Sequence, residues 1–194
     1  MITQEDLSPV GTQLFNLIEF DEDEELVWEI RKHPLGLFVV YFVGFFVAVA
    51  VLAATVFINY LLRSDALGPE VNLGSFGLLI LTVGLIIAVL SVLLTLISGY
   101  IYRRNAVLVT SEKIAQVLYK NIISRKISQL SIGDIQDVTV RQNGIFARFF
   151  NFGTLVIETA GEQQNYSFNY TPDPYKAAKE IVGAHERNLK KYGN

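Results

Sequence analysis

The chain of 194 residues contains no cysteine and only two histidines. Without cysteine it can form no disulfide, no thiolate metal site and no cysteine nucleophile. It also has no Gly-rich phosphate loop, nucleophile elbow or metal-binding helix motif. These absences predict that the protein is not an enzyme and uses no metal or cofactor, although an unrecognised membrane enzyme is kept as a minor alternative.

Charge is missing from two long stretches, residues 35–62 and 71–102. Each exceeds the roughly 20 residues that cross a bilayer core as a helix. Gly68-Pro69 between them is a turn signal. The stretches predict a two-helix transmembrane hairpin, and their lack of ionisable groups indicates an anchor and not a transport path.

The charges that flank the two stretches predict their orientation. Arg31 and Lys32 precede the first stretch, Arg103 and Arg104 follow the second, and loop 63–70 has one base and two acids. Because cytoplasmic loops carry the excess of Lys and Arg, both termini are expected in the cytoplasm. The protein is therefore predicted to be a multi-pass protein of the cell membrane.

Residues 1–34 form an acidic N-terminal segment with nine acids and two bases. The cluster at 19–25 lacks the spacing of a calcium loop, so a solvated segment is expected. Pairing of this cluster with the basic residues after the second span is the alternative. Residues 1–17 form either a surface helix or a disordered segment, and no export signal is apparent.

Residues 103–194 have thirteen bases and eight acids, and their apolar residues alternate as in strands. Short turns between these strands favour an antiparallel meander. The expected strands are Ala106–Thr110, Lys113–Tyr119, Ile122–Ser128, a strand through Val138 and Val140, Thr154–Thr159 and Asn165–Tyr170.

The last segment predicts an amphipathic helix, with Asp173 as N-cap and Pro174 at the first helical position. Its apolar face is expected to contain Ala178, Ile181, Val182, His185 and Leu189. The fold class is then an α+β membrane protein. Its transmembrane hairpin is followed by a pleckstrin-homology (PH)-like antiparallel β-barrel or sandwich, which the C-terminal α-helix caps.

Five segments in this order resemble one family: Glu25–Pro34, Val109–Ile114, Ile132–Val138, Phe152–Gly161 and Pro172–Pro174. The chain resembles the bacterial PH-like membrane proteins of the DUF304 type, also called YdbS-like or bPH2. The resemblance excludes about the first twenty residues. It implies a PH-like fold at the bacterial inner membrane, and it implies no catalytic residues and no settled ligand.

The Phe-rich segment 144–153 is the main candidate site. Large apolar side chains in a connection between strands need an explanation. They could dip into the membrane interface with arginines near phosphates, or pack into the domain core or against the spans. The candidate membrane or partner contacts are Arg141, Ile145, Phe146, Arg148, Phe149, Phe150 and Phe152.

The other charged residues predict no site. Asp134 and Asp137 have no histidine nearby in sequence, and His185 is expected at the core edge. Nucleic-acid binding is not expected, since the domain is only modestly basic. The remaining bases are expected to be solvated on strand faces and not to form one basic cup. These are Lys113, Lys120, Arg125 and Lys126, with the two arginines already named.

The sequence therefore predicts a membrane-anchored PH-like module that recruits or stabilises a protein partner at the cytoplasmic face. The lipid bilayer itself is the second expected partner. Recognition of anionic lipid head groups by the basic, Phe-rich segment is the alternative function.

Overall fold

The computed structural model describes residues 3–20, 24–64, 76–159 and 165–193, and the chain separates into two compact units. One unit contains residues 37–100, and the other joins residues 1–36 to residues 101–194. The Gly68-Pro69 turn and the first residues of the second predicted span lie outside the described residues.

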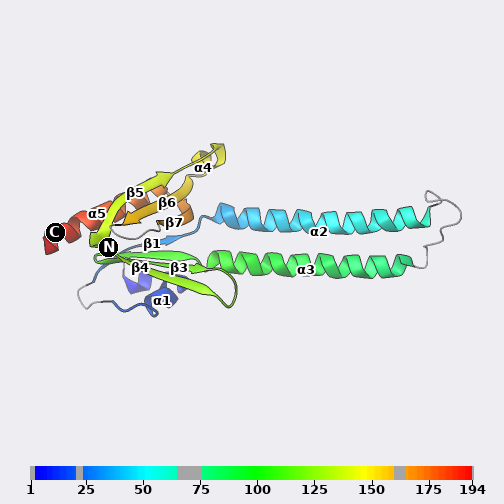
Figure 1. The fold of residues 1–194 in the computed structure, drawn as a ribbon, viewed down its shortest axis with the longest axis horizontal. Helices are drawn as coiled ribbons and strands as arrows, with labels where there is room; N and C mark the ends of the chain where they lie inside the picture. The colour runs from blue at the N-terminus through cyan, green and yellow to red at the C-terminus, as the bar shows by residue number, and fades with distance from the viewer. Residues whose placement is uncertain (1–2, 21–23, 65–75, 160–164, 194) are drawn as a thin grey trace. The chain divides into compact units, whose positions relative to one another are not determined.

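The first of these units is a pair of helices that run side by side (Figure 1). Helix α2 covers Pro34–Arg63 and α3 covers Gly77–Arg103. Both are long and apolar enough to cross a membrane. At 1.5 Å per residue they measure about 45 and 40 Å, more than the roughly 30 Å hydrocarbon core of a bilayer.

The second unit contains two antiparallel sheets with strand orders β1-β2-β3-β4 and β5-β6-β7. Among the described residues no strand pairing closes them into a barrel, so the predicted barrel or sandwich is open. The strands are β1 (Leu26–Arg31), β2 (Ala106–Thr110), β3 (Lys113–Tyr119), β4 (Arg125–Ser131), β5 (Ile135–Arg141), β6 (Phe152–Thr159) and β7 (Tyr166–Pro172).

Strand β1 is not predicted by the sequence pattern, which indicates a separate acidic segment over residues 1–34. β1 pairs with β2, although both long helices lie between the two strands in the sequence. Arg31 lies opposite Ala106 in this pair. The helical pair is thus an insertion in the β1–β2 connection. The folded unit is therefore built from residues on both sides of that insertion.

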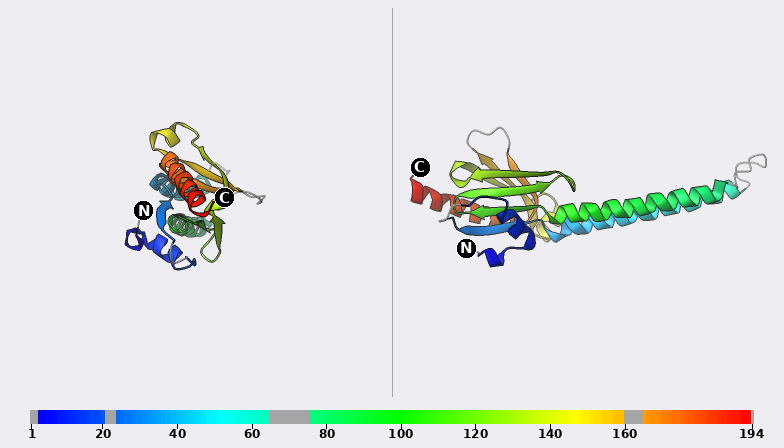
Figure 2. Two further views of the ribbon diagram at one scale, coloured as in Figure 1. Left: turned by 90° about the vertical axis from the view of Figure 1, so that its left-hand side faces the viewer. Right: turned by 90° about the horizontal axis from the view of Figure 1, so that it is seen from below.

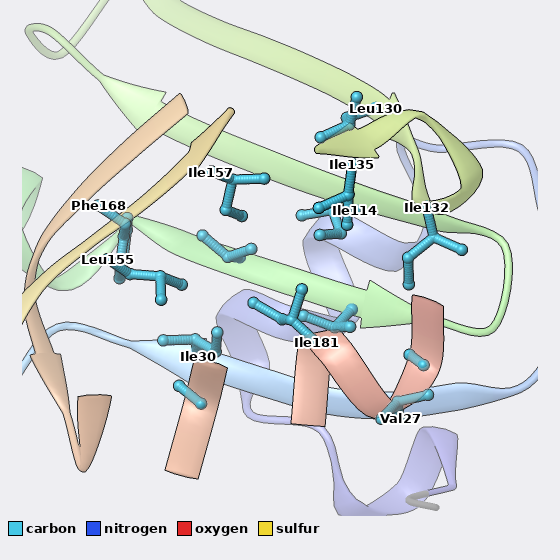
Figure 3. Packing of buried hydrophobic residues seen from close by; sticks show 14 residues of the cluster. Val27, Ile30, Ile114, Leu130, Ile132, Ile135, Leu155, Ile157, Phe168 and Ile181 are labelled. Carbon is cyan, nitrogen blue, oxygen red and sulfur yellow. The ribbon is translucent and has the colours of Figure 1, made fainter. Parts of the chain in front are cut away.

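The core lies between the two sheets and helix α5 (Pro174–Tyr192). Figure 3 shows Ile181 of α5 among side chains of both sheets, including Ile30 and Leu155. The buried residues of α5 are Pro174, Ala177, Ile181 and Ala184, whereas Val182 is exposed. The predicted helix start is correct, but Asp173 makes no side-chain cap hydrogen bond.

The N-terminal segment covers the outer face of the first sheet (Figure 2). After the 3₁₀ turn η1 (Gln4–Asp6), helix α1 (Pro9–Phe15) buries Leu14 against a cluster that includes Leu108 of β2. Residues 1–17 are thus helical in part. All five residues of β2 are buried as a result, because the strand has packed neighbours on both faces.

Candidate functional site

The chain leaves the folded unit after β1 and returns to it at β2, and both points lie at one end of the unit, which we call the exit end. β1 finishes there at Arg31, opposite Ala106 at the start of β2. Ala106 lies opposite Val117 near the end of β3, and Tyr119 lies opposite Arg125 at the start of β4. The β3–β4 turn therefore projects from the exit end.

Aromatic side chains join the second sheet to the exit end. The His33 backbone N–H donates to the Tyr170 carbonyl at 2.6 Å, and the Tyr102 hydroxyl donates to the His33 carbonyl at 2.8 Å. The Phe152 ring stacks on Tyr170 at 5.3 Å between centroids and lies 5.5 Å from the His33 ring. The ends of β6 and β7 therefore lie where the chain leaves for the long helices.

The Phe-rich segment forms the short helix α4 (Ile145–Phe149) at the tip of the β5–β6 hairpin (Figure 1). Its side chains are strongly exposed: 84% for Ile145, 72% for Phe146 and 80% for Phe149. Phe150 is 39% exposed, and only Ala147 is buried. Packing into the core, one of the two sequence-based alternatives, is therefore wrong for these side chains.

A polar pocket of about 270 Å³ lies beside α4. Thr154 Oγ1 donates to Asn169 Oδ1 across its lining at 3.1 Å. A Cβ at Gly153 would lie 2.9 Å from the Arg141 carbonyl, so the position requires glycine. The lining residues are Arg141, Asn143, Ala147, Phe152, Gly153, Thr154, Asn169 and Tyr170.

Backbone strain gathers around this pocket. Asn151, Tyr170 and Asp173 have φ values of 51°, 59° and 41°, and they are the non-glycine residues with positive φ in the described chain. The Asp173 N–H donates to the Asn151 carbonyl at 3.0 Å, and the Asn151 amide donates to the Asp173 carboxylate. Strain of this kind is commonly found at ligand sites, so it marks the α4 region as a functional candidate.

The β3–β4 turn also exposes apolar side chains, which the sequence pattern does not predict. Ile122 is 57% and Ile123 is 98% exposed in the β3–β4 turn. The Asn121 carboxamide oxygen accepts from the N–H groups of Ile123 (3.0 Å) and Ser124 (2.6 Å), and this holds the turn. The predicted strand Ile122–Ser128 was shifted, because this Asn-centred turn overrides the β-propensity of the two isoleucines.

The candidate bases fall into three places. The expected solvation on a strand face is wrong for Lys113, which pairs with a buried carboxylate. Lys113 lies at the far end of the sheet and pairs with Glu24 at 3.0 Å. Lys120, Arg125 and Lys126 belong to the β3–β4 hairpin, and Arg141 and Arg148 flank α4.

The carboxylates and histidines have structural contacts. The Thr139 hydroxyl donates to the Asp137 carboxylate at 2.7 Å, and His185 Nδ1 lies 2.6 Å from the Ile132 carbonyl. His185 thus lies at the core edge, as predicted. Among the described residues no three His, Asp or Glu side chains come close enough to hold a metal.

One family model and one solved structure are similar to this chain. The family model for the bacterial PH domain matches residues 33–182. A crystal structure of a DUF1696 family protein with a pleckstrin-homology domain from Shewanella loihica PV-4 is similar at 16% identity and a TM-score of 0.34. That match covers 42% of this chain and 71% of the other. No curated protein matches the sequence.

Proposed function

The chain belongs to the bacterial PH domain family, and from that membership we propose that it is a membrane-anchored interaction module. In this proposal α2 and α3 anchor the PH-like unit at the cytoplasmic face, and α4 docks on the anionic surface of the bilayer. The observation that carries the proposal is the exposure of Ile145, Phe146 and Phe149 at the exit end.

The anchor is supported by the surface of the helical pair. Phe and Leu side chains such as Phe45, Phe57 and Leu94 are about 60% exposed on α2 and α3. In water this much apolar surface would be strongly unfavourable, whereas lipid tails solvate it. Basic residues at the helix ends favour cytoplasmic termini by the positive-inside rule.

The free energy available from burying the apolar side chains of α4 supports its docking on the bilayer. Full burial of an Ile or Phe side chain stabilises by roughly 1.5–3 kcal/mol, and Arg141 and Arg148 add attraction to anionic head groups. A chain already tethered to the bilayer loses little further translational freedom on docking. Even partial insertion of three large side chains then suffices to hold the tip on the surface.

The test uses the full chain with a photo-crosslinking residue in place of Phe149, in cell membranes. We expect lipid adducts at this position and none from the same residue in place of Glu186, an exposed position on α5. Adducts with protein alone would contradict lipid docking. A Phe149→Ser variant should lose its apolar contact with the bilayer without unfolding, since the Phe149 side chain is 80% exposed.

A second candidate function is recruitment of a protein partner, and the polar pocket beside α4 favours it. Its strained rim and its Arg, Asn and Thr lining could receive a polar side chain of a partner. Protein adducts from Phe149, with loss of the same partner on Asn169→Leu substitution, would support this function. Recovery of this chain alone after crosslinking would count against it.

A further inference from the structure

The β3–β4 turn presents apolar side chains on a rigid support. The Asn121 side-chain oxygen fixes the turn by accepting two hydrogen bonds from backbone N–H groups, and Ile123 at 98% exposure has no packing role in the folded unit. Tyr119 and Arg125 pair at its base, where the Tyr119 N–H donates to Asn105 Oδ1 at 2.7 Å. The exposed isoleucines are thus held at a fixed place on the exit end.

Positive charge gathers at the base of the same turn. The Arg104 guanidinium lies 5.8 Å from the centre of the Tyr119 ring. Burial alone would raise the pKa of Tyr119, but the guanidinium groups of Arg125 and Arg104 outweigh it and lower the pKa. The hairpin from Lys113 to Ser131 contains four bases and no acid. Arg104 over the Tyr119 ring and Arg125 opposite Tyr119 in the strand pair make a local positive field that suits a phosphate group.

We propose that the β3–β4 turn is a second membrane-docking tip, in which Ile122 and Ile123 enter the bilayer interface while Arg104, Arg125 and Lys120 contact lipid phosphates. This inference rests on the proposed function in one respect, that the exit end faces the bilayer. It adds a separate element from the other sheet, with its own apolar and basic residues.

A bilayer surface suits this tip better than a protein does. Two isoleucines on one turn offer far less area than the roughly 800 Å² per partner of a standard protein interface. Insertion into a fluid interface needs no complementary pocket, and basic residues beside apolar ones are typical of membrane-surface segments. The turn also projects from the end at which the chain enters its two apolar helices.

Docking at two tips has a consequence that docking at one does not. The β3–β4 turn belongs to the first sheet, and α4 connects strands of the second. One contact would leave the unit free to tilt about it. Contacts from both sheets hold the PH-like unit in one orientation on the bilayer, with α5 and the far ends of the strands turned to the aqueous phase.

The test exploits the absence of cysteine, since single-cysteine variants of the full chain can be labelled specifically. Ile123→Cys, Phe149→Cys and Ser131→Cys are each labelled with an environment-sensitive fluorophore in nanodiscs containing phosphatidylglycerol. Ser131 is the control because it is exposed at the opposite end of β4. We expect blue-shifted emission and quenching by lipid-attached nitroxides at 123 and 149, and neither at 131.

The two proposals fail separately in this experiment. An aqueous signal at 123 with a membrane signal at 149 would overturn the second tip and leave the proposed function intact. A membrane signal at 123 with an aqueous signal at 149 would overturn α4 docking. Aqueous signals at both positions would overturn both.

A second set of variants tests whether the basic residues contact lipid phosphates. Lys120→Gln and Arg125→Gln, both at exposed positions, are combined with the label at position 123. Each lost charge is expected to lower the docked-to-free ratio about fivefold on anionic nanodiscs and to leave it unchanged on phosphatidylcholine. Arg125→Lys is the control and should retain docking. Equal signals on both lipids before and after substitution would refute the phosphate contacts.

Discussion

Glu24 shows at the scale of one residue how the acidic N-terminal segment is used. Its carboxylate is fully buried, lies 3.0 Å from Lys113 Nζ and accepts from the Thr110 hydroxyl. The expectation of a solvated acidic segment is therefore wrong at Glu24, and the alternative pairing with a basic residue is correct there. Asp21, Glu22 and Asp23 of the same cluster lie outside the described residues.

Substitution Glu24→Gln should destabilise the folded unit. It removes the charge that faces Lys113 while the site stays buried, and hydrogen bonds to charged groups contribute about 1.5–3 kcal/mol each. We expect the free energy of unfolding, measured by chemical denaturation of the full chain in detergent, to fall by about that amount. Glu25→Gln is the matched control, because the exposed Glu25 should change stability by less than about 0.5 kcal/mol. Equal effects of the two substitutions would contradict a structural role for the buried pair.

Single residues also show what sequence patterns cannot reveal. The run Phe146–Phe152 is easily noticed in the sequence. The sequence does not show that its side chains are exposed, because a core segment and a surface tip can have the same apolar composition. Ile122 and Ile123 fit a strand by propensity, but they form a turn because the Asn121 carboxamide oxygen accepts hydrogen bonds from the N–H groups of Ile123 and Ser124. The open question at the Phe-rich segment and the shifted strand at Ile122 are thus both decided by tertiary exposure or local polar geometry, which a propensity does not record.

At the scale of elements, the α2–α3 pair is packed through small residues. The threonine hydroxyls bond within their own helices, Thr55 to the Val51 carbonyl at 2.7 Å and Thr95 to the Ser91 carbonyl at 2.8 Å. Asn59 Nδ2 donates across to the Gly77 carbonyl at 2.7 Å. Close approach of helices at small residues is typical of membrane interfaces.

Substitution Gly84→Val should separate α2 from α3. A Cβ at Gly84 would lie 2.2 Å from Thr55 Oγ1, which no contact tolerates. We expect a loss of about 1–3 kcal/mol, seen as earlier thermal unfolding of the full chain in detergent. The matched control is Ala54→Val on the exposed face of α2. Adding Thr55→Ala to Gly84→Val should recover part of the loss, and absence of any recovery would argue against this contact.

Elements differ in how well the sequence predicts them. β2 and β3 lie within the predicted bounds because alternation and a two-residue turn are local signals. Small residues spaced four apart on α2 differ in their surroundings: Gly44 and Ala48 lie toward α3, whereas Ala50 and Ala54 are exposed. β1 was missed because its partner strand lies beyond both long helices in sequence, and no local pattern records such a pairing.

At the scale of the whole molecule, the insertion in the β1–β2 connection determines how the PH-like unit is attached. Two covalent links, at Arg31 and Ala106, leave from one end of one sheet. In the proposed function the exit end is the part of the unit that the chain joins to the membrane-crossing helices, so its exposed tips need only weak affinity for lipid.

The insertion also predicts which fragment folds. Residues 105–194 alone lack β1, so Val107 and Val109 of β2 would lose their neighbour in the sheet and the core would lose Val27 and Ile30. Replacing residues 34–103 by a loop of about four residues keeps β1 beside β2 as an ordinary hairpin. We expect this shortened chain to be soluble, monomeric and cooperatively folded, and the 105–194 fragment to aggregate or remain unfolded.

Circular dichroism, thermal denaturation and size-exclusion chromatography of the two fragments check this expectation. The decisive control is the shortened chain with Ile30→Ala. Because Ile30 is 2% exposed in the core, that substitution should cost about 2–5 kcal/mol if β1 is packed as it is in the full chain. A folded 105–194 fragment, or a shortened chain indifferent to Ile30→Ala, would mean that β1 is dispensable. In that case the long helices would precede the domain and would not interrupt it.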